Sequence, residues 1–186
     1  MKDGVNVIPL NGLSQLSAPR STYVVVGAGK TGIDACLWLL QQRVAPDQIY
    51  WVMPRDSWYF KRDRLHPGDL DMLRDFFLSC IASSEADSTV HDFHCRLERD
   101  GTFFRLDPQV IPLKNKCVTV AEEELQALRR IKNIVCMGHV TRLEKGCMVM
   151  QRGRVAMPDD TLYADCSRNG LARMPHTPVF SECITL

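Results

Sequence analysis

Three glycines at dinucleotide spacing carry the strongest chemical signal in the sequence. They lie in the run Gly27, Ala28, Gly29, Lys30, Thr31, Gly32, which has the pattern Gly-x-Gly-x-x-Gly. Between a strand and a helix, the first glycine permits a tight turn and the second lets a pyrophosphate approach the backbone. The third allows close helix-sheet packing, and the free amides at the helix N-terminus favour phosphate. These six residues therefore predict a cofactor-binding turn for a dinucleotide.

Arg55 bears on the choice of cofactor. It follows Met53 and Pro54 at the end of the second expected strand, where NAD sites usually place an Asp or Glu for the ribose hydroxyls. A guanidinium there suits a 2′-phosphate, so the sequence favours NADP, while Asp56 leaves NAD possible. The same missing carboxylate argues against an S-adenosylmethionine methyltransferase, which also uses a glycine-rich first turn.

A second phosphate-binding motif competes for the same residues. The run Gly29-Lys30-Thr31 resembles the end of a P-loop, which needs another glycine five positions before Gly29. That position is Val24, inside the expected strand. A nucleotide triphosphatase is therefore disfavoured.

The elements around the turn predict an α/β fold. Residues 22–26 are β-branched and apolar on both faces, as in a buried strand of a parallel sheet. Residues 33–44 have helical apolar spacing, and residues 49–53 indicate a second strand. Strand, glycine turn, helix and strand form a crossover unit, so we expect a Rossmann-like parallel sheet. Asp34, in the first helical turn, is expected to be a dipole or capping partner.

The remaining segments predict an insertion and a meander. We expect a helical insertion over about residues 57–132, which opens with a basic surface loop and contains helices from Asp69 and near Val90. A capping box at Thr119 and Glu122 predicts one more helix. Further expected elements are strands at 134–136 and 161–165 and a β-meander at 139–157.

The expected divisions of the chain are an N-terminal connector (1–20), a nucleotide-binding domain (21–170) and a C-terminal connector (171–186). In the basic loop, Lys61, Arg62 and Arg64 are each expected to be ordinary solvated residues.

Composition excludes several classes of protein. The chain has 186 residues, a net charge of +1 and 45% hydrophobic residues, which fits one neutral domain and not a nucleic-acid binder. No apolar run approaches the ~20 residues of a membrane span, and no secretory signal is evident. We therefore expect a cytoplasmic protein without membrane or nucleic-acid partners.

The cysteines and histidines give no metal or disulfide signal. The eight cysteines contain no Cys-x-x-Cys pair, which argues against structural zinc and a redox disulfide and favours free, buried thiols. His91 and His94 lie one helical turn apart, but no third ligand completes a metal site. Cys166 is expected to be a structural thiol. No catalytic residue and no metal ligand is predicted.

Two segments also carry a family resemblance. Tyr23-Val-Val-Val-Gly-Ala-Gly-Lys-Thr-Gly-Ile-Asp34 and Ile49-Tyr-Trp-Val-Met-Pro-Arg-Asp56 resemble the NAD(P)-binding domain of two-dinucleotide flavoproteins. This group of FAD/NAD(P)-binding oxidoreductases includes flavin-containing monooxygenases and pyridine nucleotide-disulfide reductases. The likeness is strongest to little-characterised bacterial members. There it extends through Leu106-Asp107-Pro108, residues 125–131 and the segment from Asp165 to Phe180.

The resemblance implies an NADP(H)-binding portion of a flavin-dependent oxidoreductase. Its nicotinamide would deliver hydride to FAD held by a separate domain, encoded before and after this segment. That family has Ala-Thr-Gly at the crossing back to the flavin domain, where this chain has Asp165-Cys166-Ser167. The alternative is a non-catalytic nucleotide-binding or protein-interaction module. Self-association could then cover the surface where a flavin domain would dock.

Overall fold

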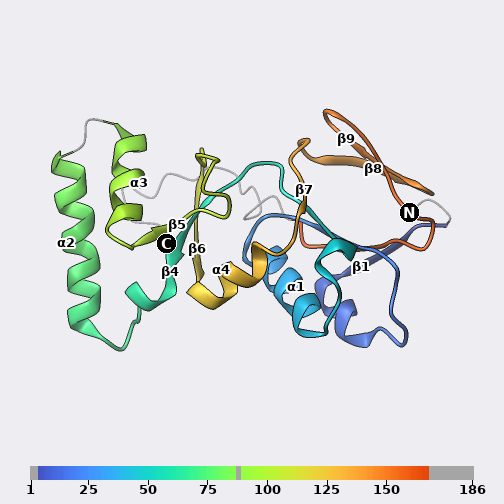
Figure 1. The fold of residues 1–186 in the computed structure, drawn as a ribbon, viewed down its shortest axis with the longest axis horizontal. Helices are drawn as coiled ribbons and strands as arrows, with labels where there is room; N and C mark the ends of the chain where they lie inside the picture. Colours follow the sequence, from blue (N-terminus) through green and yellow to red (C-terminus); the bar gives the residue numbers. More distant parts are fainter. Residues whose placement is uncertain (1–3, 87–88, 168–186) are drawn as a thin grey trace, which may run out of the picture.

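A parallel sheet organises the chain (Figure 1). The computed structural model describes residues 4–86 and 89–167. Five strands follow the order β1-β11-β2-β3-β7, and every neighbouring pair is parallel. They are β1 (Asn6–Pro9), β2 (Tyr23–Val26), β3 (Ile49–Val52), β7 (Asn133–Val135) and β11 (Leu162–Asp165). The α/β class and the strands expected near residues 22, 49, 134 and 161 are confirmed.

Helices cover one face of this sheet. Val25, Trp51 and Ala164 point to that face and share one core with the helical residues Ile33 and Leu125. The helices are the 3-10 helix η1 (Leu10–Gln15), α1 (Lys30–Gln41) and α4 (Glu122–Leu128). A short 3-10 helix, η2 (Pro46–Gln48), joins α1 to β3. The helix expected at 33–44 begins and ends three residues earlier than predicted. Arg43, just after its end, has a positive φ of 63°, which is not a helical conformation.

An antiparallel sheet covers the other face. Val24, Val52 and Tyr163 pack there against Met148 and Met150. The covering strands are β8 (Val140–Glu144), β9 (Cys147–Met150) and β10 (Gly153–Ala156), which confirms the expected meander. Because β2 and β3 are covered on both faces, they carry continuous apolar residues instead of an alternating pattern.

The N-terminal segment differs from its expectation. We expected residues 1–20 to be a connector, but β1 extends the parallel sheet by pairing with β11 over four register positions. Buried Leu13 of η1 joins the main core. The sequence does not indicate this strand, because Asn6 and Pro9, which are uncommon in strands, stand at its two ends. The expected C-terminal connector at 171–186 lies outside the described residues.

The insertion is not purely helical, and its basic loop was wrongly assigned. Residues 58–61 form strand β4, in which Trp58 and Tyr59 are buried. A second small sheet has the order β5-β4-β6. The insertion contains β4 (Trp58–Lys61), the 3-10 helix η3 (Arg62–Arg64), α2 (Leu70–Ala86), α3 (Val90–Arg99), β5 (Phe103–Phe104) and β6 (Asn115–Val120). The aromatic residues before the basic cluster supply the buried face of this sheet.

The basic residues of the insertion differ in their surroundings. Arg62 makes a two-pronged ion pair with Glu124 of α4, at 2.9 and 2.7 Å, and Lys61 lies 3.7 Å from Glu122. Arg64 donates weakly to the carbonyl of Asp100. The first two are therefore not plain solvated residues, because they tie the insertion to the helix that follows it.

Helix α2 leaves one of its apolar stripes exposed. Leu70, Phe77 and Ile81, which share one face of the helix, are 80%, 58% and 53% exposed. The helix instead packs through Phe76, whose ring lies 5.8 Å from that of Phe60, and through Cys80. Helices α2 and α3 lie at the end of the molecule away from β8 and β9 (Figure 1). None of the helices in residues 4–86 and 89–167 has the length and apolarity to cross a membrane.

Candidate functional site

The first glycine of the motif closes a tight turn after β2. Gly27 has a φ of +132°, and a Cβ there would lie 2.6 Å from the carbonyl oxygen of Cys166. Its amide donates to Val52 at 3.1 Å, and its carbonyl accepts from the indole Nε1 of Trp51 at 2.8 Å. The protein's own packing therefore requires glycine at this position.

The third glycine is also explained by packing, whereas the second is not. A Cβ on Gly32 would overlap the carbonyl oxygen of Gly27, so only glycine lets α1 approach the turn this closely. A Cβ on Gly29 would meet no protein atom within 4 Å, and its φ of −91° suits any residue. Nothing among the described residues explains the glycine at position 29.

Helix α1 begins with free backbone donors. Gly29 is its N-cap residue, and its first helical hydrogen bond runs from Ile33 to Gly29 at 3.1 Å. The amides of Lys30, Thr31 and Gly32 donate to no other described residue. The first turn holds no acidic side chain that could cap them. Asp34 forms an ion pair with Lys30, so it neutralises a side chain and does not cap an amide.

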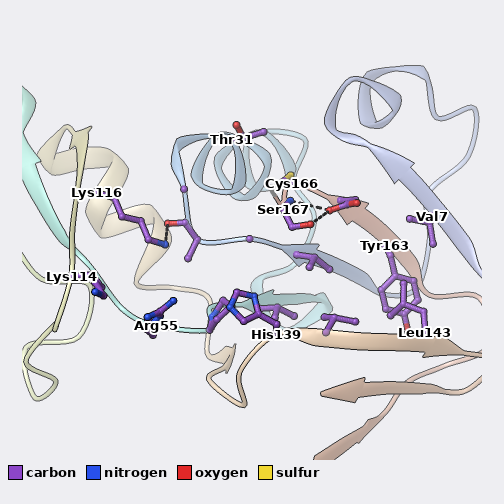
Figure 2. A pocket seen from close by; sticks show the side chains of 18 of the residues that line it. Val7, Thr31, Arg55, Lys114, Lys116, His139, Leu143, Tyr163, Cys166 and Ser167 are labelled. Atoms are coloured by element: carbon purple, nitrogen blue, oxygen red, sulfur yellow. Dashed lines mark hydrogen bonds between the residues drawn. The ribbon is translucent and has the colours of Figure 1, made fainter. Parts of the chain in front are cut away.

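A cleft lies beside the start of α1, at the carboxyl edge of the parallel sheet (Figure 2). The cleft has a volume of about 710 Å³, within the usual range for small-molecule sites. The ends of β2, β3 and β11 form its floor, and the insertion and meander supply its walls. Its lining includes Gly27, Ala28, Gly29, Thr31, Arg55, Lys114, Lys116, His139, Tyr163 and Asp165.

One end of the cleft is cationic. Arg55 follows β3, Lys114 and Lys116 come from the β6 region of the insertion, and His139 precedes β8. Lys116 Nζ donates to the carbonyl of Ala28 at 3.3 Å. Desolvation and the neighbouring Arg55 lower the pKa of Lys116, and Asp56 partly offsets this. The site thus gathers positive charge beside the glycine turn.

Asp56 lies outside this cleft. Its Oδ1 accepts from the amide of Ser57 at 2.7 Å, and its side chain lines a separate cavity of about 600 Å³ with Asp107 and Cys136. Burial raises the pKa of the Asp56 carboxyl. Of the two residues weighed for cofactor choice, the structure places only Arg55 in the cleft.

The other end of the cleft is formed by the turn after β11. Ser167 donates from its amide and its hydroxyl to Asp165 Oδ1, at 2.9 and 2.6 Å. The amide of Cys166 donates to Val26 at 2.9 Å, which ties this turn to β2. Burial and the carboxylates of Asp165 and Asp34 raise the pKa of Cys166 to about 11. Its thiol is protonated near neutral pH and is a poor nucleophile.

The other cysteines and the paired histidines do not form a site. The seven described cysteines are all free, but only Cys36 is buried, so the expectation of mostly buried thiols was wrong. The ring of His94 stacks on those of Trp58 and Phe103, with its centroid 5.4 Å from each. Within residues 4–86 and 89–167, no three His, Cys, Asp or Glu side chains gather to hold a metal ion.

Sequence reasoning missed Lys114, Lys116 and His139. Lys114 and Lys116 follow Ala28 of the turn by 86 and 88 positions, and no local spacing connects them with it. The one available signal was the run Lys114-Asn115-Lys116 in a segment with few other charges. Of the residues predicted to bind the cofactor, Gly27, Ala28, Gly29, Thr31 and Arg55 line the cleft, whereas Lys30 and Gly32 are not among its lining residues.

Comparison with known proteins finds uncharacterised mycobacterial relatives. The chain is 44% identical over 179 residues to an uncharacterized protein of Mycobacterium bovis and to uncharacterized proteins of two Mycobacterium tuberculosis strains. The match covers 95% of this chain and 33% of each relative, so the chain spans about a third of the length of the curated relatives it matches. Neither a family model nor a solved structure matches the chain.

The glycine geometry predicts a stability difference between two substitutions. Gly32→Ala should lower the free energy of unfolding by about 1–3 kcal/mol, the usual cost of overpacking, because its methyl group meets a backbone carbonyl. Gly29→Ala should change it by less than about 0.5 kcal/mol, because its methyl group enters open space. Urea unfolding followed by circular dichroism measures both. Equal stabilities would mean that α1 does not approach the turn as described.

Proposed function

We propose that this chain is a Rossmann-type NADP(H)-binding portion of a flavin-dependent oxidoreductase. The observation that carries the proposal is Gly29. Packing accounts for the glycines on either side of it, but the space beside Gly29 is open and faces the cleft. A dinucleotide pyrophosphate that lies against the backbone at this point would explain the absence of a side chain.

The N-terminus of α1 supports a phosphate ligand. Three successive amides, those of Lys30, Thr31 and Gly32, lack an acceptor in the described chain, and the helix dipole adds partial positive charge. Thr31 also lines the cleft. In the proposed complex these groups hold the pyrophosphate, and Gly29 lets it come close.

The strand order supports a dinucleotide lying across the cleft. From β2 the chain moves outward to β3 and β7, and it then returns to β11 on the other side of β2. Ligands of open α/β sheets bind at such a reversal, beyond the carboxyl ends of the strands. We place the adenosine half near Arg55 and His139, and the nicotinamide half near Tyr163 and Asp165.

The placement of Arg55 and Asp56 favours NADP over NAD. A carboxylate that accepts from the ribose hydroxyls would have to lie in the cleft. Asp56 instead accepts from the Ser57 amide and lines the separate cavity described above. Arg55 lines the cleft and has no carboxylate partner among the described residues. A guanidinium without a partner suits a 2′-phosphate.

The flavin part of the proposal rests on the family resemblance. The nicotinamide would present hydride to FAD held by another domain, and the cofactors would carry the redox chemistry. This chain's own contribution is to bind and orient the nucleotide. The protonated thiol of Cys166 takes no part as a nucleophile, since its pKa of about 11 is far above neutral pH.

Gly29→Val should abolish NADPH binding and leave the fold intact. Its Cβ would enter open space, and its side chain would occupy the place proposed for the pyrophosphate. Isothermal titration calorimetry measures the affinity, and Gly68→Val, in an exposed loop outside the cleft, is the matched control. Undiminished NADPH affinity in folded Gly29→Val protein would refute the pyrophosphate position.

Arg55→Ala should weaken NADPH more than NADH. The extra loss should be roughly 1.5–3 kcal/mol, the range for hydrogen bonds to charged groups, because only NADPH carries the 2′-phosphate. Arg130→Ala removes an exposed guanidinium outside the cleft and serves as the control. Equal losses for the two nucleotides would show that Arg55 does not contact the 2′-phosphate.

The flavin-linked role can be tested in a longer relative. This chain matches 33% of the Mycobacterium tuberculosis relative. We expect that purified relative to contain bound flavin and NADPH to reduce this flavin under anaerobic conditions. Absorbance spectra before and after anaerobic NADPH addition measure both properties. A relative that binds NADPH but holds no flavin would instead support the non-catalytic nucleotide-binding module.

A further inference from the structure

The cations of the insertion differ in their partners. Four of those outside the cleft are paired with carboxylates: Arg62 with Glu124, Lys61 with Glu122, Arg74 with Asp71 and Arg105 with Glu98. Arg64, Arg129 and Lys132, which also lie outside the cleft, donate to backbone carbonyls. Lys114 and Lys116, which line the cleft, form no ion pair with any residue in 4–86 and 89–167. Arg55 beside them is likewise unpaired within those ranges. Three neighbouring cations that form no ion pair within the described ranges indicate a site for an anion.

Lys116 contacts the glycine turn from the insertion. Its ammonium group lies 3.3 Å from the carbonyl oxygen of Ala28, the residue between Gly27 and Gly29 (Figure 2). This is the one hydrogen bond of Lys116 Nζ within the described chain, and it is long for a charged donor. The ammonium group is thus held loosely beside the open space at Gly29.

We propose that Lys116 is a pyrophosphate-binding residue, which the insertion contributes to the nucleotide site opposite the N-terminus of α1. This inference rests on the proposed function and deepens it. On binding, the ammonium group gives up the Ala28 carbonyl and donates to a non-bridging oxygen of the pyrophosphate. The amides of α1 hold the pyrophosphate from one side and Lys116 holds it from the other.

The electrostatics favour this exchange. Desolvation and repulsion by Arg55 lower the pKa of Lys116 in the free protein, and Asp56, whose carboxylate accepts from the Ser57 amide, compensates only in part. A pyrophosphate would replace a neutral carbonyl by an anionic acceptor and relieve this repulsion. Charge-assisted hydrogen bonds are about twice as strong as neutral ones. The exchange therefore stabilises the bound state.

Lys116 and Arg55 should recognise different phosphates. Lys116 lies at the turn, where the pyrophosphate shared by NADPH and NADH is placed. Arg55 follows β3, where the 2′-phosphate found only in NADPH is placed. Loss of the Lys116 charge should therefore weaken both nucleotides by the same factor, unlike loss of Arg55.

The test compares Lys116→Met, Lys116→Arg and Lys132→Met in the full chain. Lys132 is the matched control, because its Nζ also donates to a backbone carbonyl, that of Arg129 at 2.8 Å, and it lies outside the cleft. Titration calorimetry with NADPH and with NADH should show a loss of roughly tenfold to a hundredfold for Lys116→Met with both. Lys116→Arg should retain most of the affinity, and Lys132→Met all of it.

A second measurement needs no substitution. An amine-acylating reagent should modify Lys116 more slowly when NADPH or NADH is bound, whereas Lys132 should react at an unchanged rate. Mass spectrometry of the digested protein reads both sites.

The outcomes separate the two proposals. If the unaltered chain binds neither nucleotide, the proposed function fails and this inference fails with it. If it binds them but Lys116→Met binds equally well, or Lys116 is not shielded, only the present inference is overturned. A loss confined to NADPH would assign Lys116 to the 2′-phosphate and would also overturn it.

Discussion

The close contact between the start of α1 and the end of β2 is the constraint on which the site depends. Gly32 has no room for a Cβ against the Gly27 carbonyl, and the Trp51 indole donates to the same carbonyl at 2.8 Å. This contact fixes the first turn of α1 beside the strand ends. The turn after β11 lies equally close, because Cys166 leaves no space for a side chain on Gly27. The free amides of α1 and the floor of the cleft are both consequences of this packing.

The insertion gives the cleft a second wall. Its small sheet joins the main core through Tyr59, Val118 and Val120, and the Arg62–Glu124 pair ties it to α4. The β6 region is thereby held across from the glycine turn, with Lys114 and Lys116 directed into the cleft. A segment that the sequence presents as an interruption of the crossover thus forms part of the site.

Local patterns predicted the elements next to the glycine motif well. The strands near residues 22 and 49, the glycine turn and α1 follow from contiguous residues with clear periodicity. Prediction was poorer where pairing with distant residues decides the structure. Thr119 and Glu122 match a capping box, but Thr119 belongs to strand β6, where it pairs with Phe60 of β4. Helix α4 therefore begins only at Glu122, and Glu124 accepts from the amide of Ala121. Residues 58–61 were predicted as part of a surface loop because basic residues follow them.

The candidate site could be predicted only in part, for the same reason. The motif residues and Arg55 are contiguous with strands that the sequence reveals. Lys116 reaches Ala28 across 88 positions, through a strand pairing that no local pattern specifies. Arg55 lines the cleft, whereas Asp56 accepts from the Ser57 amide and lines another cavity. Sequence spacing does not reveal this hydrogen bond.

Hydrogen exchange of the amides at the start of α1 is the most direct test of phosphate binding at this end of the helix. Saturating NADPH should slow the exchange of Lys30, Thr31 and Gly32, because these free donors gain phosphate acceptors. Amides in the middle of the same helix, at Leu37 and Leu39, should be unaffected and serve as the internal reference. Unchanged exchange at the three amides, with NADPH bound, would show that α1 does not hold the phosphates and that the nucleotide binds elsewhere.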